Sequence, residues 1–154
     1  MAGQRVLVPY NFTIYDQKVI DFIIRTFLAV KELKFTLFHA YAPLPEIQTG
    51  SNAVLGRLQG TMMSLSEELS GQERYLKEGK GALVKKGFSD DQVDYIFKAK
   101  KKDVANEIAE KAIGGNYEMI ILSRRPGKIT RLFSHSVSGK LLSTIKGKTV
   151  CIVS

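Results

Sequence analysis

Residues 123–140, with the sequence SRRPGKITRLFSHSVSGK, contain the residue types that bind phosphate groups. An apolar run at 119–122 leads into a basic loop that holds Arg124 and Arg125, and serines then precede a predicted helix. A strand, a loop and a helix N-terminus in this order hold phosphates, because unpaired backbone N–H groups point at the anion. Glycines are scarce where such a loop would need them. The stretch therefore indicates a nucleotide site, an altered form of one, or a basic surface loop.

The other residues that could do chemistry form no catalytic or metal-binding pattern. His39 and His135 are the only histidines, and neither has metal-ligand spacing or a plausible cysteine partner. We interpret both as residues packed near the predicted crevice. The aspartates are scattered at predicted caps and turns, and the GKT at 147–149 leads from a helix into a strand, the reverse of a P-loop. We therefore expect no catalytic residue, no metal site and no enzymatic activity.

The composition is typical of one globular domain spanning residues 1–154. Hydrophobic residues make up 44% of the chain and charged residues 25%, which argues against disorder. No apolar run approaches the roughly 18–20 residues that a membrane span needs, and the N-terminus does not resemble a secretory signal. The single cysteine, Cys151, excludes an intramolecular disulfide and is interpreted as a buried small hydrophobic residue. These features predict a cytoplasmic protein without membrane contact.

The chain is basic, with a formal net charge of +8. Its densest positive cluster is formed by Lys98, Lys100, Lys101 and Lys102, with Phe97 as the only aromatic neighbour. Charge alone steers polyanions but does not read a sequence, which requires base-contacting or stacking groups. We interpret the cluster as a solvated turn, and we expect no sequence-specific nucleic-acid binding.

Hydrophobic periodicity predicts alternating strands and helices. Short apolar runs predict five strands, at residues 4–10, 34–42, 92–99, 117–123 and 148–154. Helical spacing fills the intervals, and Thr13 and Asp103 are expected to cap the first and third helices. Regular alternation with near-continuous apolar strands predicts an α/β fold with a parallel sheet covered on both faces. Ligands bind such sheets where the strand order reverses, so residues 9–13 and 122–136 should meet.

The second predicted helix is the longest, and it carries a single apolar stripe. The stripe consists of Leu58, Met62, Leu65, Leu69, Leu76 and Leu83. Met62 and Met63 are interpreted as core residues, and the segment before the helix, at 46–56, is predicted to be polar and mobile.

Five segments of the chain resemble, in order, parts of the universal stress protein family. They are RVLVPYNFT, FTLFHAYAP, KKDVANEIAEKA, YEMIILSRR and RLFSHSVSGKLL. The first is similar to the family's opening strand, hydrophobic-Val-Pro-x-Asp-x-Ser, and the fourth to a strand ending in Met-Gly-Thr-Arg-Gly. The resemblance covers essentially the whole chain. It implies a five-stranded parallel sheet of order 3-2-1-4-5 with helices on both faces, a Rossmann-like fold of the adenine nucleotide alpha hydrolase type, commonly in dimers.

The resemblance also bears on ATP, because members that bind it carry Gly-x2-Gly-x9-Gly-Ser/Thr before the last helix. When the chain is aligned on SVS, the three glycine places fall on Leu122, Arg125 and His135, and the Ser/Thr place falls on Ser136. The family's opening-strand Asp, which meets the nucleotide, falls on Asn11. Side chains at the glycine places would obstruct the approach of a phosphate to the backbone. ATP binding is therefore expected to be weak or lost, and no cofactor is expected.

The predicted crevice takes residues from both ends of the chain. Its members are Pro9, Tyr10, Asn11, Ala40, Leu122, Arg124, Arg125, His135, Ser136, Val137 and Ser138. The two arginines could still bind an anion by charge. Asn11 has two equally supported roles, since an Asn shortly before a helix often satisfies backbone N–H groups in a turn instead of binding a ligand.

The favoured interpretation is a non-catalytic universal stress protein-like domain that acts by dimerisation and by binding an unknown protein partner. The dimer is expected to form through the C-terminal strand, at Val150, Cys151, Ile152 and Val153, because an apolar edge strand needs cover. Two alternatives remain at this point. One is a nucleotide binder with a rearranged phosphate loop, and the other is a basic accessory domain for nucleic acid.

Overall fold

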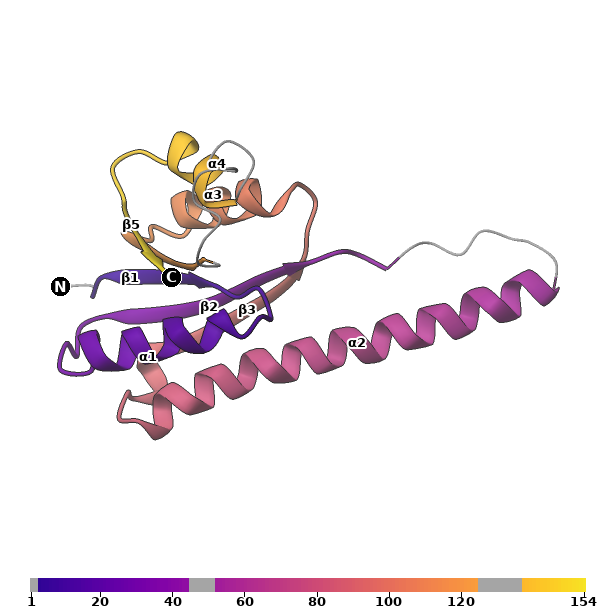
Figure 1. Cartoon of the computed structure of the whole chain (residues 1–154), viewed down its shortest axis with the longest axis horizontal. Helices are drawn as coiled ribbons and strands as arrows, with labels where there is room; N and C mark the ends of the chain where they lie inside the picture. The colour runs from indigo at the N-terminus through magenta and orange to yellow at the C-terminus, as the bar shows by residue number, and fades with distance from the viewer. Residues whose placement is uncertain (1–2, 45–51, 125–136) are drawn as a thin grey trace.

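A five-stranded, all-parallel sheet forms the centre of the molecule (Figure 1). The structure is a computed structural model, and it describes residues 3–44, 52–124 and 137–154. The strands are β1 (Arg5–Pro9), β2 (Lys34–Tyr41), β3 (Val93–Ala99), β4 (Met119–Ser123) and β5 (Thr149–Val153). Their order across the sheet is β3-β2-β1-β4-β5. The predicted α/β class, the parallel sheet and the order 3-2-1-4-5 are confirmed.

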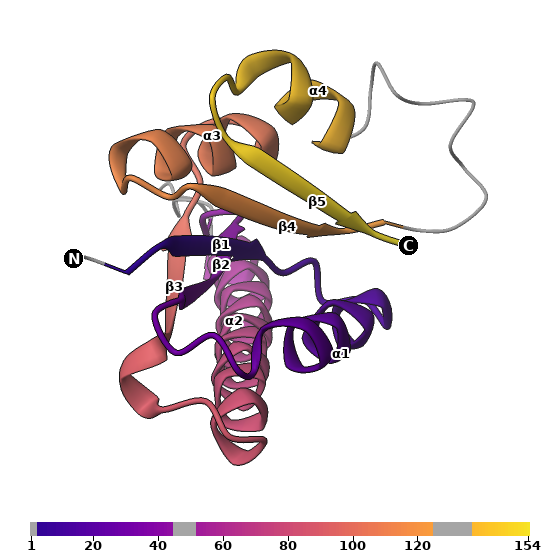
Figure 2. The ribbon, with the colours of Figure 1, turned by 90° about the vertical axis from the view of Figure 1, so that its left-hand side faces the viewer.

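Helices cover both faces of this sheet (Figure 2). They are α1 (Tyr15–Phe27), α2 (Asn52–Lys85), α3 (Val104–Gly114) and α4 (Val137–Thr144), with a short 3₁₀ turn, η1 (Asp90–Gln92), before β3. Alternate residues of the central strands point to opposite faces. Val6 and Val8 of β1 join a core beneath α1 and α2, whereas Leu7 joins a second core beneath α3 and α4. This two-sided burial explains why the strands are nearly continuous apolar runs.

Helix α2 is much longer than the sheet that it covers. Its 34 residues span about 51 Å at 1.5 Å per residue, whereas the eight residues of β2 span about 27 Å. The C-terminal half packs on the sheet, where Leu76 and Leu83 are completely buried, and the N-terminal half extends beyond it (Figure 1). Met63 is 69% exposed, so the interpretation of the methionine pair as core residues is wrong for it. The stripe continues there, but the sheet that would bury it has ended.

Two other local predictions need correction. Residues 52–56 belong to α2 and not to a polar linker, while 45–51 lie outside the described residues. Cys151 is only partly buried, because β5 is an edge strand of the sheet.

Capping residues define the ends of the helices. Asp103 caps α3 as predicted, accepting the backbone N–H of Asn106 at 2.9 Å, and Gly115 follows the last residue of that helix. At α1 the cap position is Ile14, whose side chain cannot accept a hydrogen bond. The predicted cap, Thr13, lies one residue earlier, and its Oγ1 accepts the N–H of Tyr15 at 3.3 Å. Thr13 therefore satisfies a donor of the first turn from outside the helix.

Candidate functional site

The crevice predicted at the switch in strand order is bridged by two polar side chains. Asn11 follows β1 and Ser123 ends β4, and these strands are neighbours in the sheet. The Nδ2 of Asn11 donates a hydrogen bond to the Oγ of Ser123 at 3.1 Å. The structure thus brings together the carboxyl ends of β1 and β4, as predicted from the alternation of elements.

A buried carboxylate organises the turn that holds Asn11. Asp16 is 2% exposed, and its two oxygens accept the backbone N–H groups of Asn11 and Thr13, each at 3.2 Å. Burial raises the pKa of this carboxyl, and the hydrogen bond from the Asn11 N–H opposes that rise. Between these two anchors Phe12 adopts a φ of 57°, in the left-handed region that non-glycine residues rarely enter. Asp16 was not among the predicted site residues; its signal was an acidic residue in the first turn of a helix.

The predicted crevice residues divide between the two faces of the sheet. Tyr10 is 4% exposed and joins the core beneath α1 and α2, where burial raises the pKa of its hydroxyl. Ala40 and Leu122 join the core beneath α3 and α4. Pro9 ends β1 in register with Phe38. The residues named at adjacent positions therefore do not line one common surface.

The expected steric role of Leu122 is wrong. Leu122 is 3% exposed and packs against the core residues Leu141 and Ile145, so its side chain does not stand at the mouth of the crevice. Ser123 stands there instead, beside Asn11. Strand alternation is the physical reason, because a shift of one residue moves a side chain to the other face. The place at the end of β4 that could contact a ligand is therefore Ser123.

The remaining predicted residues lie partly outside the described chain. Arg124 is described, and its backbone N–H donates to the carbonyl of Val153 at 2.8 Å, which extends the β4–β5 pairing by one residue. Arg125, His135 and Ser136 lie outside the described residues. Val137 and Ser138 begin α4, but their side chains are outside the description.

Aromatic rings gather around His39, near the carboxyl end of β2. The Nδ1 of His39 lies 2.8 Å from the carbonyl oxygen of Tyr10. The ring of Phe12 meets the imidazole edge-on at a centroid distance of 4.3 Å, and that of Phe97 stacks on it at 6.0 Å. Burial lowers the pKa of His39, which favours the neutral imidazole. Since a carbonyl only accepts hydrogen bonds, the proton of the neutral ring resides on Nδ1.

The lysine-rich turn is organised by a second buried carboxylate. Glu107 is 2% exposed and accepts the backbone N–H groups of Lys101 and Lys102 at 2.6 and 3.0 Å. Its other oxygen lies 3.0 Å from the Nζ of Lys98. The N–H of Lys101 and the neighbouring lysine groups lower the pKa of Glu107 to about 2. Lys102 also pairs with Glu110, so part of the positive charge of this turn is neutralised within the fold.

Within the part of the chain that is described, no group of three or more His, Cys, Asp or Glu side chains could hold a metal ion. In the same residues, no helix is both long enough and apolar enough to cross a membrane.

The fold and the position of the crevice agree with the comparison to known families. The model of the universal stress protein family matches residues 3–152, and the chain belongs to this family. No curated protein matches the chain.

Solved structures of similar fold cover nearly the whole chain. Universal stress protein UspA from Lactobacillus plantarum superposes with a TM-score of 0.67 at 10% identity, covering 100% of this chain and 99% of that one. The universal stress protein from Archaeoglobus fulgidus in complex with dAMP has a TM-score of 0.62 at 13% identity, covering 100% of both chains. A universal stress protein in complex with cAMP has a TM-score of 0.63 at 14% identity, covering 100% and 98%. At these identities the likeness shows a shared Rossmann-like fold.

Proposed function

We propose that this chain is a non-catalytic universal stress protein domain that acts in the stress response by pairing with a second copy and binding a protein partner. In this proposal its affinity for ATP is weak or lost. Support comes first from the hydrogen bond between Asn11 and Ser123, at the place where the family's nucleotide would meet the opening strand.

The chemistry of Asn11 weakens a ribose contact in two ways. A carboxylate accepts hydrogen bonds through both oxygens with full charge assistance, whereas an amide has one neutral acceptor and an NH₂ donor. Here the NH₂ already donates to the Oγ of Ser123, which bridges the strands that a ligand would have to reach between. A nucleotide must break this bond and gains a weaker acceptor in return.

The pairing proposal is supported by the position and composition of β5. The strand is an edge of the sheet, its sequence TVCIV carries no charge, and its last four residues are only partly buried. An open apolar edge invites pairing with another strand, and a two-fold axis would cover both copies at once. The lysine turn offers less support for nucleic acid, because Lys98 and Lys102 are paired with Glu107 and Glu110.

Nucleotide binding is the second candidate, and the complexes of two solved relatives with dAMP and cAMP favour it. A gain-of-binding experiment separates the two candidates. Calorimetry with Mg²⁺-ATP would compare the wild type with the double variant Asn11→Asp, Ser123→Gly, which restores the carboxylate and clears the end of β4. We expect at least a fivefold gain in affinity for the double variant, because it removes the bridge and supplies a charged acceptor.

The matched control is Asn106→Asp, which adds the same charge on α3 and should leave the affinity unchanged. If the double variant folds normally and gains no affinity, Asn11 and Ser123 are not the cause of weak binding. Micromolar binding by the wild type would instead favour the second candidate.

A further inference from the structure

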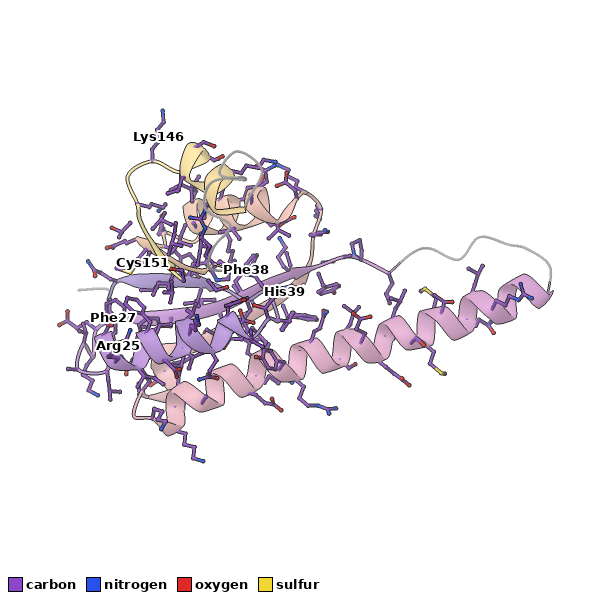
Figure 3. All side chains as sticks on the ribbon, in the orientation of Figure 1. Arg25, Phe27, Phe38, His39, Lys146 and Cys151 are labelled. Atoms are coloured by element: carbon purple, nitrogen blue, oxygen red, sulfur yellow. The ribbon has the colours of Figure 1, made fainter. Side chains whose placement is uncertain are left out.

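A hollow of about 260 Å³ opens between the carboxyl end of β2 and the middle of α2. Six of its lining residues carry the argument: His39, Tyr41, Leu65, Glu68, Leu69 and Gln72. Figure 3 labels His39 near the end of β2 that faces α2. The hollow lies where α2 begins to extend beyond the sheet, so the helix and the strand form its two walls (Figure 1).

This hollow is separate from the nucleotide crevice of the family. Neighbouring residues of a strand point to opposite faces, and β2 shows this at His39 and Ala40. Ala40 is 5% exposed within the core beneath α3 and α4, whereas His39 lines the hollow together with α2. A ligand in the hollow would therefore contact the other face of the sheet from the one that holds Ala40 and Leu122.

The polar groups of the hollow are rich in unused acceptors. The Oε1 of Gln72 is buried and has no hydrogen-bond partner, and it is the one such side-chain atom in the described part of the chain. His39 keeps its proton on Nδ1 for the carbonyl of Tyr10, which leaves Nε2 as an acceptor. Glu68 adds a carboxylate to the same wall. A buried acceptor without a partner is costly, so a donor from a ligand would be stabilising.

The charge of the hollow is opposite to the charge of the whole chain. Lysine and arginine outnumber aspartate and glutamate by 23 to 15, yet neither basic type lines the hollow. Glu68 is its only formally charged group when His39 is neutral. An anionic ligand would meet a carboxylate and unpaired acceptors, whereas a cation with several N–H donors would match all three polar groups.

Apolar side chains form the rest of the lining. Leu65 and Leu69 lie on the α2 stripe, and Tyr41 supplies an aromatic ring that packs on Phe97 at a centroid distance of 4.5 Å. Aromatic faces also attract organic cations. The size of the hollow lies just below the range of drug-sized pockets, so it suits a ligand of fragment size.

We propose that this hollow binds a small organic amine, whose ammonium group donates to Glu68 and to the Oε1 of Gln72 while its apolar body packs on Leu65, Leu69 and Tyr41. The class is defined by the site: a compact cation with an apolar or aromatic body. This inference does not depend on the state of the nucleotide crevice.

Three probes of nearly equal shape test the charge requirement. They are 2-phenylethylamine, 2-phenylethanol and 3-phenylpropanoate, each titrated into the full chain with methyl signals observed by NMR. We expect saturable shifts of the Leu65 and Leu69 methyl groups with the amine, with a dissociation constant of about a millimolar, the range open to so small a ligand. The alcohol should bind at least fivefold more weakly and the carboxylate should not saturate.

A neighbouring pair of glutamates on α2 provides the matched variants. Glu68→Gln removes the charge of the hollow, and Glu67→Gln removes an exposed charge that does not line it. The amine should lose at least fivefold in affinity with Glu68→Gln and less than twofold with Glu67→Gln. Equal binding of amine and alcohol, equal effects of the two variants, or shifts confined to other methyl groups would each overturn the proposal.

Discussion

Two buried carboxylates hold the loops of this molecule through backbone N–H groups. Asp16 binds the turn after β1, and Glu107 binds the turn after β3. The two differ in the balance that sets their pKa values. Desolvation dominates at Asp16 and raises its pKa, whereas the N–H of Lys101 and the charge of Lys98 dominate at Glu107 and lower it. Each residue positions a loop at the carboxyl edge of the sheet, where ligands of this fold bind.

Glu107 gives a pH-dependent prediction at the residue scale. Its pKa falls from an ordinary value of 4.5 to about 2 in the folded chain. A lowered folded-state pKa stabilises the fold above pH 4.5, and this contribution is lost as the pH falls toward 2. We expect Glu107→Gln to cost about 1–3 kcal/mol at pH 7, because two N–H groups lose a charged acceptor. The difference from wild type should shrink steadily between pH 4.5 and pH 2.

Urea unfolding at pH 7, 4 and 3 measures this difference directly. The control is Glu110→Gln, an exposed residue of the same helix paired only with Lys102, which should change stability little at any of these pH values. A cost for Glu107→Gln that is the same at pH 7 and pH 3 would show that its charge is not what holds the turn.

At the scale of elements, the two halves of α2 should contribute unequally to stability. Leu76 and Leu58 lie on one stripe of the helix, but Leu76 is fully buried and Leu58 is 36% exposed. We expect Leu76→Ala to cost about 2–5 kcal/mol, as a buried leucine does, and Leu58→Ala to cost less than about 1 kcal/mol. Denaturant unfolding of both variants makes the comparison. Equal costs would mean that the N-terminal half of α2 is buried in solution, by a partner or a second copy.

The helix also shows how far the sequence predicts this structure. Periodicity identifies the face of a helix, and for α1, α3 and the end of α2 that face meets the sheet as predicted. It does not say how long the opposing surface is, and this is why Met63 was assigned to the core. The crevice shows the same limit, because a spacing rule placed Leu122 at its mouth while strand alternation turns that residue inward and leaves Ser123 there. Asp16 and Glu107 escaped notice because nothing in sequence separates a loop-binding carboxylate from an exposed one.

At the scale of the whole molecule, the open edge of β5 predicts a dimer. Ile152 lies on this strand and is partly exposed in the single chain. A charge there should separate the copies, because a carboxylate buried between two paired edges has no partner. We expect light scattering to report a dimer for the wild type and a monomer for Ile152→Asp. Ile113→Asp, at a 57% exposed position on α3, should remain dimeric. A wild-type monomer at tens of micromolar would refute this assembly.

The most direct test of the account is the affinity of the wild-type chain for Mg²⁺-ATP, measured by titration calorimetry at physiological salt. The loss of one good polar contact weakens binding by about ten- to a hundredfold, and Asn11 and Ser123 affect the contact at the opening strand. Exposed arginines next to the crevice recover little of this at such ionic strength. We predict a dissociation constant weaker than about 100 µM. A value below about 10 µM, roughly −7 kcal/mol, would contradict the account and identify the chain as a nucleotide-binding member of its family.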